Sequence, residues 1–134
     1  MDVIFSRLQK VNRQHGDAAM FDIDDTLIRS RDKEVITDIK TILEFCKNIG
    51  LEIIIITARP AEGRIYTEQQ LEDAGIYYDK LFFAAAGDKG TLKQILNNRF
   101  VLSVGDLETD CTDSMYSLKL PGPADYNGFF LGPA

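Results

Sequence analysis

Two aspartates stand two positions apart, directly after a short apolar segment near the start of the chain. In MFDIDDT, Asp22 and Asp24 are separated by one residue, so on extended backbone their side chains project to the same side. Such a pair of carboxylates is costly without a counter-cation, and ligands that are all oxygen suit a hard ion such as Mg²⁺. The pair therefore predicts chemistry assisted by a cation at this point of the chain.

Further polar residues follow the later apolar segments. Thr57 ends the run IIIIT, Lys89 lies near the start of a helical pattern, and Asp106 and Asp110 follow VLSVG. With the first pair they supply acids, a hydroxyl and an ammonium, which are the groups that phosphoryl transfer to a carboxylate requires. The set predicts a phosphoryl-transfer site.

Strands alternating with helices must position these residues. The apolar pattern predicts strands over 18–24, 51–57, 78–84, 100–106 and 116–120. It predicts helices over 1–16, over 35–49, over a segment that ends near Gly75, and over 88–98. In the last helix we expect Leu92, Ile95 and Leu96 to face inward.

The alternation predicts an α/β fold, a three-layer sandwich with a central parallel sheet and helices on both faces. In such sheets ligands bind at the carboxyl ends of the strands, which is where the polar residues stand. The chain of 134 residues suits one domain over 1–134, with a turn-rich tail over 121–134. Phe129 and Phe130 favour a docked tail over a mobile one.

Composition narrows the class of protein. No apolar run approaches the roughly 18–20 residues that cross a bilayer, and the first residues do not resemble a signal peptide. Cys46 and Cys111 belong to no CxxC pair, so a zinc site or a disulfide framework has little support. The net charge of −6 provides no basic field for nonspecific nucleic-acid binding. We expect a cytoplasmic protein that contacts no membrane.

Four segments resemble the motifs of the haloacid dehalogenase superfamily in their order along the chain. They are FDIDDTL, IIIITAR, the lysine of GDKGTLKQIL, and VGDLETD. The first and fourth are specific in combination, whereas a lone threonine or lysine would be weak evidence. The resemblance covers residues 20–110 and implies a Rossmann-like fold and a Mg²⁺-dependent phosphatase.

The resemblance implies a role for each acidic residue. Asp22 is the nucleophile that becomes an aspartyl-phosphate, and Asp24 protonates the leaving oxygen and later activates water. Mg²⁺ is held by Asp22, by the backbone carbonyl of Asp24 and by Asp106. Asp110 is either a metal ligand or a residue that orients water or Lys89.

The resemblance also implies that Thr57 and Lys89 bind the substrate phosphate. Thr57 would donate to a phosphoryl oxygen, and Lys89 would neutralise its charge. Lys93, one helical turn later, and Lys80, before the third strand, are the alternatives to Lys89. Asp25 points away from its neighbours if the backbone is extended, so we expect it to form structural hydrogen bonds in the loop.

Two other functions compete with a phosphatase. A receiver domain also combines acids, a threonine and a lysine on a parallel sheet, but its phosphorylated aspartate resembles a residue after a middle strand. The second alternative is a catalytically silent binding or regulatory module built on the same fold. Loss of Asp22 or Asp24 would have been its sign, and both are present.

The substrate class is left open by the sequence. The stretches from Asp22 to Thr57 and from Thr57 to Lys89 each hold roughly one helix and one strand, which leaves no room for a sizeable cap domain. An open site suits a phosphate on a macromolecule end, a small phosphomonoester, or a homo-oligomer in which a partner subunit closes the site.

One further stretch, ITARPAEGRIYTEQQLEDAGIYYDKLFF, looks like that of small acid phosphatases and of the phosphatase half of polynucleotide-end-healing enzymes. This likeness is weaker than the four motifs. It makes Arg64 and Tyr66 candidate substrate contacts. Arg59 is a further candidate because it follows Thr57 closely, and a surface or salt-bridged arginine is at least as good an interpretation.

Overall fold

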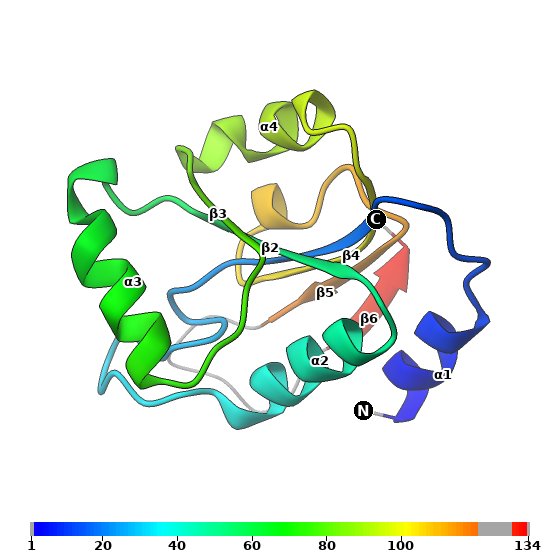
Figure 1. Ribbon diagram of the computed structural model, residues 1–134, viewed down its shortest axis with the longest axis horizontal. Coiled ribbons are helices and arrows are strands. Elements are labelled where there is room, and N and C mark those ends of the chain that lie inside the picture. Colours follow the sequence, from blue (N-terminus) through cyan, green and yellow to red (C-terminus); the bar gives the residue numbers. More distant parts are fainter. Residues whose placement is uncertain (1, 121–129, 134) are drawn as a thin grey trace.

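A six-stranded sheet forms the centre of the protein (Figure 1). This is a computed structural model, and it describes residues 2–120 and the backbone of 130–133. The strands are β1 (Asp17–Phe21), β2 (Glu52–Thr57), β3 (Lys80–Phe83), β4 (Arg99–Gly105), β5 (Tyr116–Lys119) and β6 (Phe130–Pro133). Their order across the sheet is β3-β2-β1-β4-β5-β6.

The first five strands are parallel, as predicted. The sixth pairs antiparallel with β5 at the edge of the sheet and was not expected, because the tail was interpreted as turn-rich. Its sequence FLGP contains glycine and proline, which strands usually lack, and an edge position tolerates both. The expected contact of Phe129 lies outside the described residues.

Both faces of the sheet are buried. In β1, Ala19 and Phe21 pack on one face, while Ala18 and Met20 pack on the other. The four isoleucines of β2 divide between the faces in the same alternating way. Continuous apolar strands of this kind are typical of parallel sheets covered on both sides, so the predicted three-layer sandwich is confirmed.

The helices form the two outer layers (Figure 1). They are α1 (Asp2–Lys10), α2 (Thr37–Asn48), α3 (Arg64–Asp73) and α4 (Lys89–Ile95), with single 3₁₀ turns at Ala61–Gly63, Ala86–Asp88 and Glu108–Asp110. Helices α1, α2 and α3 contribute Ile4, Ile39 and Leu71 to one core, whereas α4 packs Leu92 on the other. Helix α1 ends earlier than predicted, six residues short of Gly16.

The prediction for α4 was wrong at one position. Leu92 and Leu96 pack against the sheet as expected, but Ile95 is 73% exposed. The buried residues of the helix are instead Lys89 and Lys93. These two are four positions apart and share a face, which the fold directs toward acids and carbonyls rather than toward apolar side chains.

The sheet topology fixes where a ligand can bind. From β1 the chain adds β2 and β3 on one side, then returns to place β4 and β5 on the other. The carboxyl ends of β1 and β4 therefore flank the switch point, where a crevice forms in open α/β sheets. Asp22 follows β1 and Asp106 follows β4, and the Asp22 amide donates to the Val104 carbonyl at 3.0 Å.

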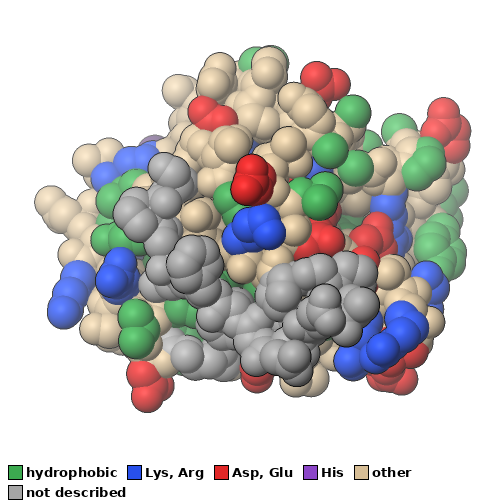
Figure 2. Space-filling view, turned by 180° about the vertical axis from the view of Figure 1, so that it is seen from behind, with side chains coloured by type: hydrophobic (Ala, Val, Ile, Leu, Met, Phe, Trp, Pro, Cys, Tyr) green, Lys and Arg blue, Asp and Glu red, His purple; other side chains and the backbone are tan. Residues whose placement is uncertain are grey.

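The surface carries charges of both signs. Figure 2 shows acidic and basic side chains interspersed on the described part of one face, with no field of a single sign. Within residues 2–120 and 130–133, no helix combines the length and the apolar character that crossing a membrane would require.

Candidate active site

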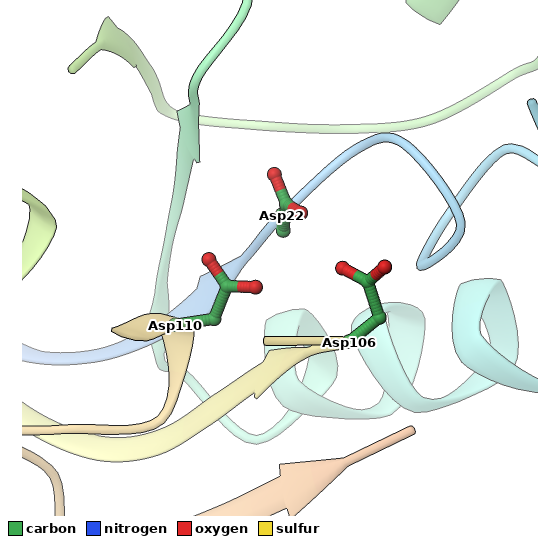
Figure 3. A group of neighbouring side chains, drawn as sticks. All are labelled: Asp22, Asp106 and Asp110. Carbon is green, nitrogen blue, oxygen red and sulfur yellow. The ribbon is translucent and has the colours of Figure 1, made fainter. Parts of the chain in front are cut away.

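Three carboxylates converge at the switch point. Asp22, Asp106 and Asp110 each offer an oxygen, and these oxygens lie within 4.8 Å of one another. Figure 3 shows the three side chains projecting from the ends of their elements into one space. Asp22 and Asp110 are buried and Asp106 is half-buried. The topology therefore brings together three of the acids that the sequence predicted.

Lys89 is the ammonium that reaches this cluster. Its Nζ donates to Asp110 Oδ1 at 2.6 Å and to Asp22 Oδ1 at 3.0 Å, and its side chain is 1% exposed. Burial alone would lower the pKa of Lys89, but the two carboxylates outweigh it and the net shift is upward. Lys89 is thus a charged amine that ties the β1 end to the turn after β4.

One ammonium does not neutralise three carboxylates, and burial together with their mutual repulsion raises the pKa of two of them. Burial raises the pKa of Asp22 to about 7, repulsion from Asp110 adds to the shift, and Lys89 opposes it. Burial and the charge of Asp110 also raise the pKa of Asp106. A bound cation would relieve this repulsion.

The turn after β4 holds Asp110 against the sheet. Asp110 ends the 3₁₀ turn Glu108–Asp110, and its Oδ2 accepts the Leu107 amide at 3.1 Å. Its carboxylate lies so close to Gly105 that a side chain at Gly105 would collide with it. The sequence pattern did not predict this contact, because a glycine at the end of a strand carries no sign of what packs against it.

Lys93 also stabilises the turn after β4, through hydrogen bonds to its backbone carbonyls. Its Nζ donates to Ser103 Oγ at 2.9 Å and to the carbonyl oxygens of Asp110 and Thr112, each at 2.7 Å. The side chain is 2% exposed, and burial lowers its pKa to about 8. The structure places Lys89, and not Lys93, beside Asp22. The spacing of the two lysines was the signal that both share one face.

Asp24 does not join the three acids. Its carboxylate accepts from Arg59 Nη2 at 2.8 Å and from Arg59 Nε at 3.0 Å, a bidentate pair. Strand β1 ends at Phe21 and the chain turns at once, so the alternation expected from extended backbone does not continue to Asp24. The salt-bridge interpretation of Arg59 is confirmed, and its pKa is raised by that bond.

The loop after β1 is held by its own hydrogen bonds. The Ile23 carbonyl accepts three amides of a tight turn, and Asp25 has a positive φ of 59°. As predicted, the Asp25 carboxylate serves the loop, because it accepts the amide of Ser30 at 2.9 Å and its hydroxyl at 2.8 Å. Leu27 is fully buried and anchors the turn to the core.

A cavity of about 410 Å³ opens over the acids, and we call it the catalytic cavity. Its lining includes Asp22, Asp24, Arg59, Pro60, Lys89 and Asp106. Thr57, at the end of β2, is fully buried, and its Oγ1 accepts the Arg59 amide at 3.1 Å. Thr57 lies behind the lining rather than in it.

The two other candidate contacts lie farther away. Arg64 lies 4.8 Å over the ring of Phe83 and donates to the Leu81 carbonyl at 3.4 Å, and it lines no part of the catalytic cavity. Tyr66 is 63% exposed and lines a neighbouring cavity of about 270 Å³ that also contains Asp24 and Arg59.

The donor set fits a hard divalent cation. Three carboxylate oxygens stand together, two of the carboxylates are buried, and Lys89 supplies one positive charge. Oxygen ligands of this kind suit Mg²⁺, Mn²⁺ or Ca²⁺ rather than a soft metal. The site can therefore hold a cation beside the carboxylate of Asp22.

The model of a sequence family, described as haloacid dehalogenase-like hydrolase, matches residues 19–86, just over half of the chain. The chain belongs to this family. The match covers the β1 end with Asp22 and Asp24 and the β2 end with Thr57. No curated protein matches the sequence of this hydrolase.

Solved structures share the fold of this hydrolase. The class C acid phosphatase from Bacillus anthracis matches with a TM-score of 0.62 and 15% identity, over 84% of this chain and 65% of that one. A chain of the Pnkp1/Rnl/Hen1 complex matches with a TM-score of 0.60 and 20% identity, over 70% of this chain and 40% of that one. A chain of the Pnkp1/Rnl/Hen1 RNA repair complex matches with a TM-score of 0.59 and 22% identity, over 74% of this chain and 39% of that one.

The chain spans 39% to 65% of the length of these neighbours. The segments between the strands hold helices and short loops, and no sizeable cap is inserted among them in the described residues. The stretches from Asp22 to Thr57 and from Thr57 to Lys89 therefore contain no large cap, as predicted.

Proposed function

We propose that this hydrolase cleaves phosphomonoesters through an aspartyl-phosphate on Asp22, with Mg²⁺ as cofactor. The observation that carries the proposal is the convergence of Asp22, Asp106, Asp110 and Lys89 at one place. Asp22, Asp106 and Lys89 line the catalytic cavity, and Asp110 is buried behind them. A nucleophilic carboxylate, a cation site and a fixed ammonium are the parts that phosphoryl transfer needs.

The chemistry divides into two displacements. A carboxylate oxygen of Asp22 attacks phosphorus, and the bond to the ester oxygen breaks with its electron pair on that oxygen. Asp24 gives this oxygen a proton, so an alcohol leaves. Water then attacks the phosphorus, Asp24 takes its proton, and the bond to Asp22 breaks to release phosphate and restore the carboxylate.

The other residues hold these groups in place. Arg59 holds Asp24 at the edge of the catalytic cavity through its bidentate bond. In the proposed reaction one Asp24 oxygen leaves Arg59 to carry the proton, while the other keeps its bond to the guanidinium. Lys89 fixes Asp22 and would offset phosphate charge. Thr57 lies behind the lining of the cavity, so its proposed role as donor to a phosphoryl oxygen requires its hydroxyl to turn into the cavity when substrate binds. Asp22, Asp106, Asp110 and the carbonyl of Asp24 would hold Mg²⁺, which supplies charge stabilisation when bound.

The substrate is a phosphomonoester, either a small molecule or a macromolecule end. An open cavity without a sizeable cap accepts both. The neighbours of known structure include an acid phosphatase and a chain of an RNA repair complex, which is consistent with either class.

The test is release of phosphate from para-nitrophenyl phosphate, a small ester that needs little recognition. We expect turnover with Mg²⁺, none with a chelator, and a loss of at least roughly 1,000-fold in Asp22→Asn, because an amide is a poor nucleophile. Asp38→Asn, an exposed aspartate at the start of α2, is the control and should keep the wild-type rate.

Mass spectrometry of the quenched reaction should find phosphate bound to the wild-type chain and not to Asp22→Asn. Full activity in Asp22→Asn would refute the mechanism. A folded, Mg²⁺-binding protein that hydrolyses no ester would favour the second candidate, a catalytically silent binding module.

A further inference from the structure

Two more cavities continue the catalytic cavity along one side of the molecule. The middle cavity, of about 270 Å³, shares Asp24, Arg59 and Pro60 with the catalytic cavity. The outer cavity, of about 440 Å³, shares Lys33 and Tyr66 with the middle one. The three form a groove between the loop after β1 and helix α3, leading away from Asp22.

The middle cavity presents a cation and an aromatic ring to solvent. Tyr66 is 63% exposed, although a large aromatic side chain is usually buried. Lys33 donates to the Ser30 carbonyl at 3.0 Å and, within residues 2–120, makes no ion pair with a carboxylate. The side chains of both are available to a ligand in the groove.

The turn that carries Lys33 is well defined. Ile28 and Val35 form an antiparallel bridge, and between them the Arg29 amide donates to Glu34 and the Lys33 amide donates to Arg29, both at 2.8 Å. Lys33 itself has a φ of 63°, which is uncommon for a residue other than glycine. The ammonium is therefore presented from a fixed backbone.

The position of the Tyr66 ring outside the catalytic cavity restricts the ligand. Tyr66 does not line the catalytic cavity, and the Arg59 guanidinium lies between them, 5.9 Å from the Tyr66 ring centroid and bonded to Asp24. An aryl phosphate would place its ring directly beside the phosphorus, short of Tyr66. A sugar between phosphate and ring would bring the ring into the middle cavity.

We propose that the middle cavity is the leaving-group subsite and that it binds the nucleoside of a nucleoside phosphate, with the base against Tyr66. The assignment rests on the proposed phosphatase function. Bases stack on exposed aromatic side chains, at about 1–3 kcal/mol per base. The nucleoside phosphate is either free or the end of a strand, whose next phosphate would reach Lys33.

The outer cavity limits how far a strand is bound. Glu34 and Asp73 line it together with the amides Gln69 and Gln70. A phosphate chain that continued along the groove would meet these carboxylates, so the bound part ends near Lys33. The net charge of −6 agrees with such a short footprint.

The experiment compares adenosine 5′-monophosphate with ribose 5-phosphate, which has the same sugar and phosphate but no base. The wild type should show the higher kcat/KM on the nucleotide, and Tyr66→Ala should reduce that preference roughly 5- to 150-fold, whereas Tyr66→Phe retains it. Ile65→Ala removes an adjacent side chain that is 84% exposed and lines none of the three cavities, and it should match the wild type.

Calorimetric binding to Asp22→Asn separates the subsite from the reaction. This variant should bind the nucleotide more tightly than ribose 5-phosphate, and the added Tyr66→Ala change should remove the difference. If Asp22→Asn binds the nucleotide and ribose 5-phosphate equally well, with or without the added Tyr66→Ala change, the proposed subsite is wrong even if the wild type is an active phosphatase. Absence of phosphate release by the wild type, with selective binding intact, would instead overturn the proposed function.

A 5′-phosphorylated dinucleotide distinguishes the two sources of the ligand. If Lys33→Gln lowers kcat/KM more for the dinucleotide than for the mononucleotide, the groove binds a strand end. If Lys33→Gln changes kcat/KM equally for both substrates, while Tyr66→Ala still reduces the preference for the nucleotide, the groove binds free nucleotides.

Discussion

Gly105 lies beneath the carboxylate of Asp110 at the end of β4. A Cβ atom there would lie 2.5 Å from Asp110 Cγ and nearer still to its Cβ and Oδ2, so Gly105→Ala must displace the acid. We expect Mg²⁺ affinity and phosphate release to fall by about 100-fold, as is usual when a reacting group moves by about 1 Å. Unfolding free energy should fall by about 1–3 kcal/mol.

The matched control is Gly87→Ala, because nothing lies within 4 Å of a Cβ atom at Gly87. Metal titration and initial rates for both variants check the prediction. Wild-type affinity and rate in Gly105→Ala would show that Asp110 does not need its present position.

Lys93 makes its bonds with neutral oxygens, unlike Lys89. In Lys93→Met the carbonyls of Asp110 and Thr112 and the hydroxyl of Ser103 lose a buried donor. We expect the free energy of unfolding to fall by about 2–3 kcal/mol. Urea denaturation measures it, with Lys10→Met on the exposed face of α1 as the control. A loss no larger than that of Lys10→Met would contradict the prediction.

Residue types after strands predicted most of the acids that gather, because the carboxyl ends of parallel strands share one edge. The sequence therefore predicted that Asp22, Asp106 and Asp110 lie near Lys89, as they do in the structure. The expected convergence of the Asp24 side chain with Asp22 was wrong. The sequence did not predict the pairing of Asp24 with Arg59. That contact depends on where β1 ends and how the loop turns, which the two-residue alternation does not describe.

At the scale of elements, the five parallel strands were predictable because each is a short, nearly continuous apolar run. The observed ends of the strands differ from the predicted ends by a few residues. Strand β1, for example, ends at Phe21 and was predicted to end at Asp24. Helix α4 was placed correctly with one wrong contact, Ile95, because periodicity cannot reveal that a helix face buries lysines. The edge strand β6 was missed because FLGP has the composition of a turn.

One ion pair joins two elements at the other end of the sheet. Arg99, on β4, donates from Nε and Nη2 to Asp17, on β1, at 2.8 and 2.7 Å, and Asp17 also accepts the Gln14 amide at 2.8 Å. The hydrogen bond from Arg99 lowers the pKa of Asp17 from its ordinary value of 3.8. The pair therefore stabilises the contact between two central strands.

Asp17→Asn should lower the free energy of unfolding by about 1–2 kcal/mol at pH 7. Because the pKa of Asp17 is lower in the folded protein, the charged form stabilises the fold above pH 3.8, and this contribution is lost as the pH falls through the folded pKa. The difference between wild type and variant should therefore narrow below pH 3.8.

Denaturation curves from pH 7 to pH 3 measure that difference. Asp32→Asn, which removes an exposed ion pair with Arg29, is the control and should change the stability little at any pH. If the difference in unfolding free energy between the wild type and Asp17→Asn stayed constant down to pH 3, the charge of Asp17 would contribute nothing to stability.

At the scale of the whole molecule, the absence of a sizeable cap was readable from the short spacing of the motifs. What that spacing could not predict is the groove beside the site, since its walls come from the loop after β1 and from helix α3. Many of the side chains that line it are polar, such as Lys33, Glu34, Gln69 and Asp73, so the apolar pattern does not reveal the groove. Tyr66 was named as a candidate contact, but its place beyond Arg59 required the structure.

The chain carries a net charge of −6, and part of that charge is concentrated where Asp22, Asp106 and Asp110 meet. Mg²⁺ that binds only the folded state should therefore stabilise the whole protein, by about 2.7 kcal/mol at one hundred times its Kd. We expect the melting temperature to rise by roughly 5–10 °C with Mg²⁺ and to return with a chelator.

General screening of the net charge by salt would also raise the melting temperature, so KCl at equal ionic strength must be compared. Asp106→Ala removes a half-buried ligand and should lose most of the Mg²⁺ effect, whereas Glu108→Ala removes an exposed acid from the same turn and should keep it. An equal rise in Asp106→Ala, or an equal rise with KCl alone, would place the stabilising ion elsewhere than between these carboxylates. A rise specific to Mg²⁺ and to Asp106 would tie global stability to the acids that the proposed reaction uses.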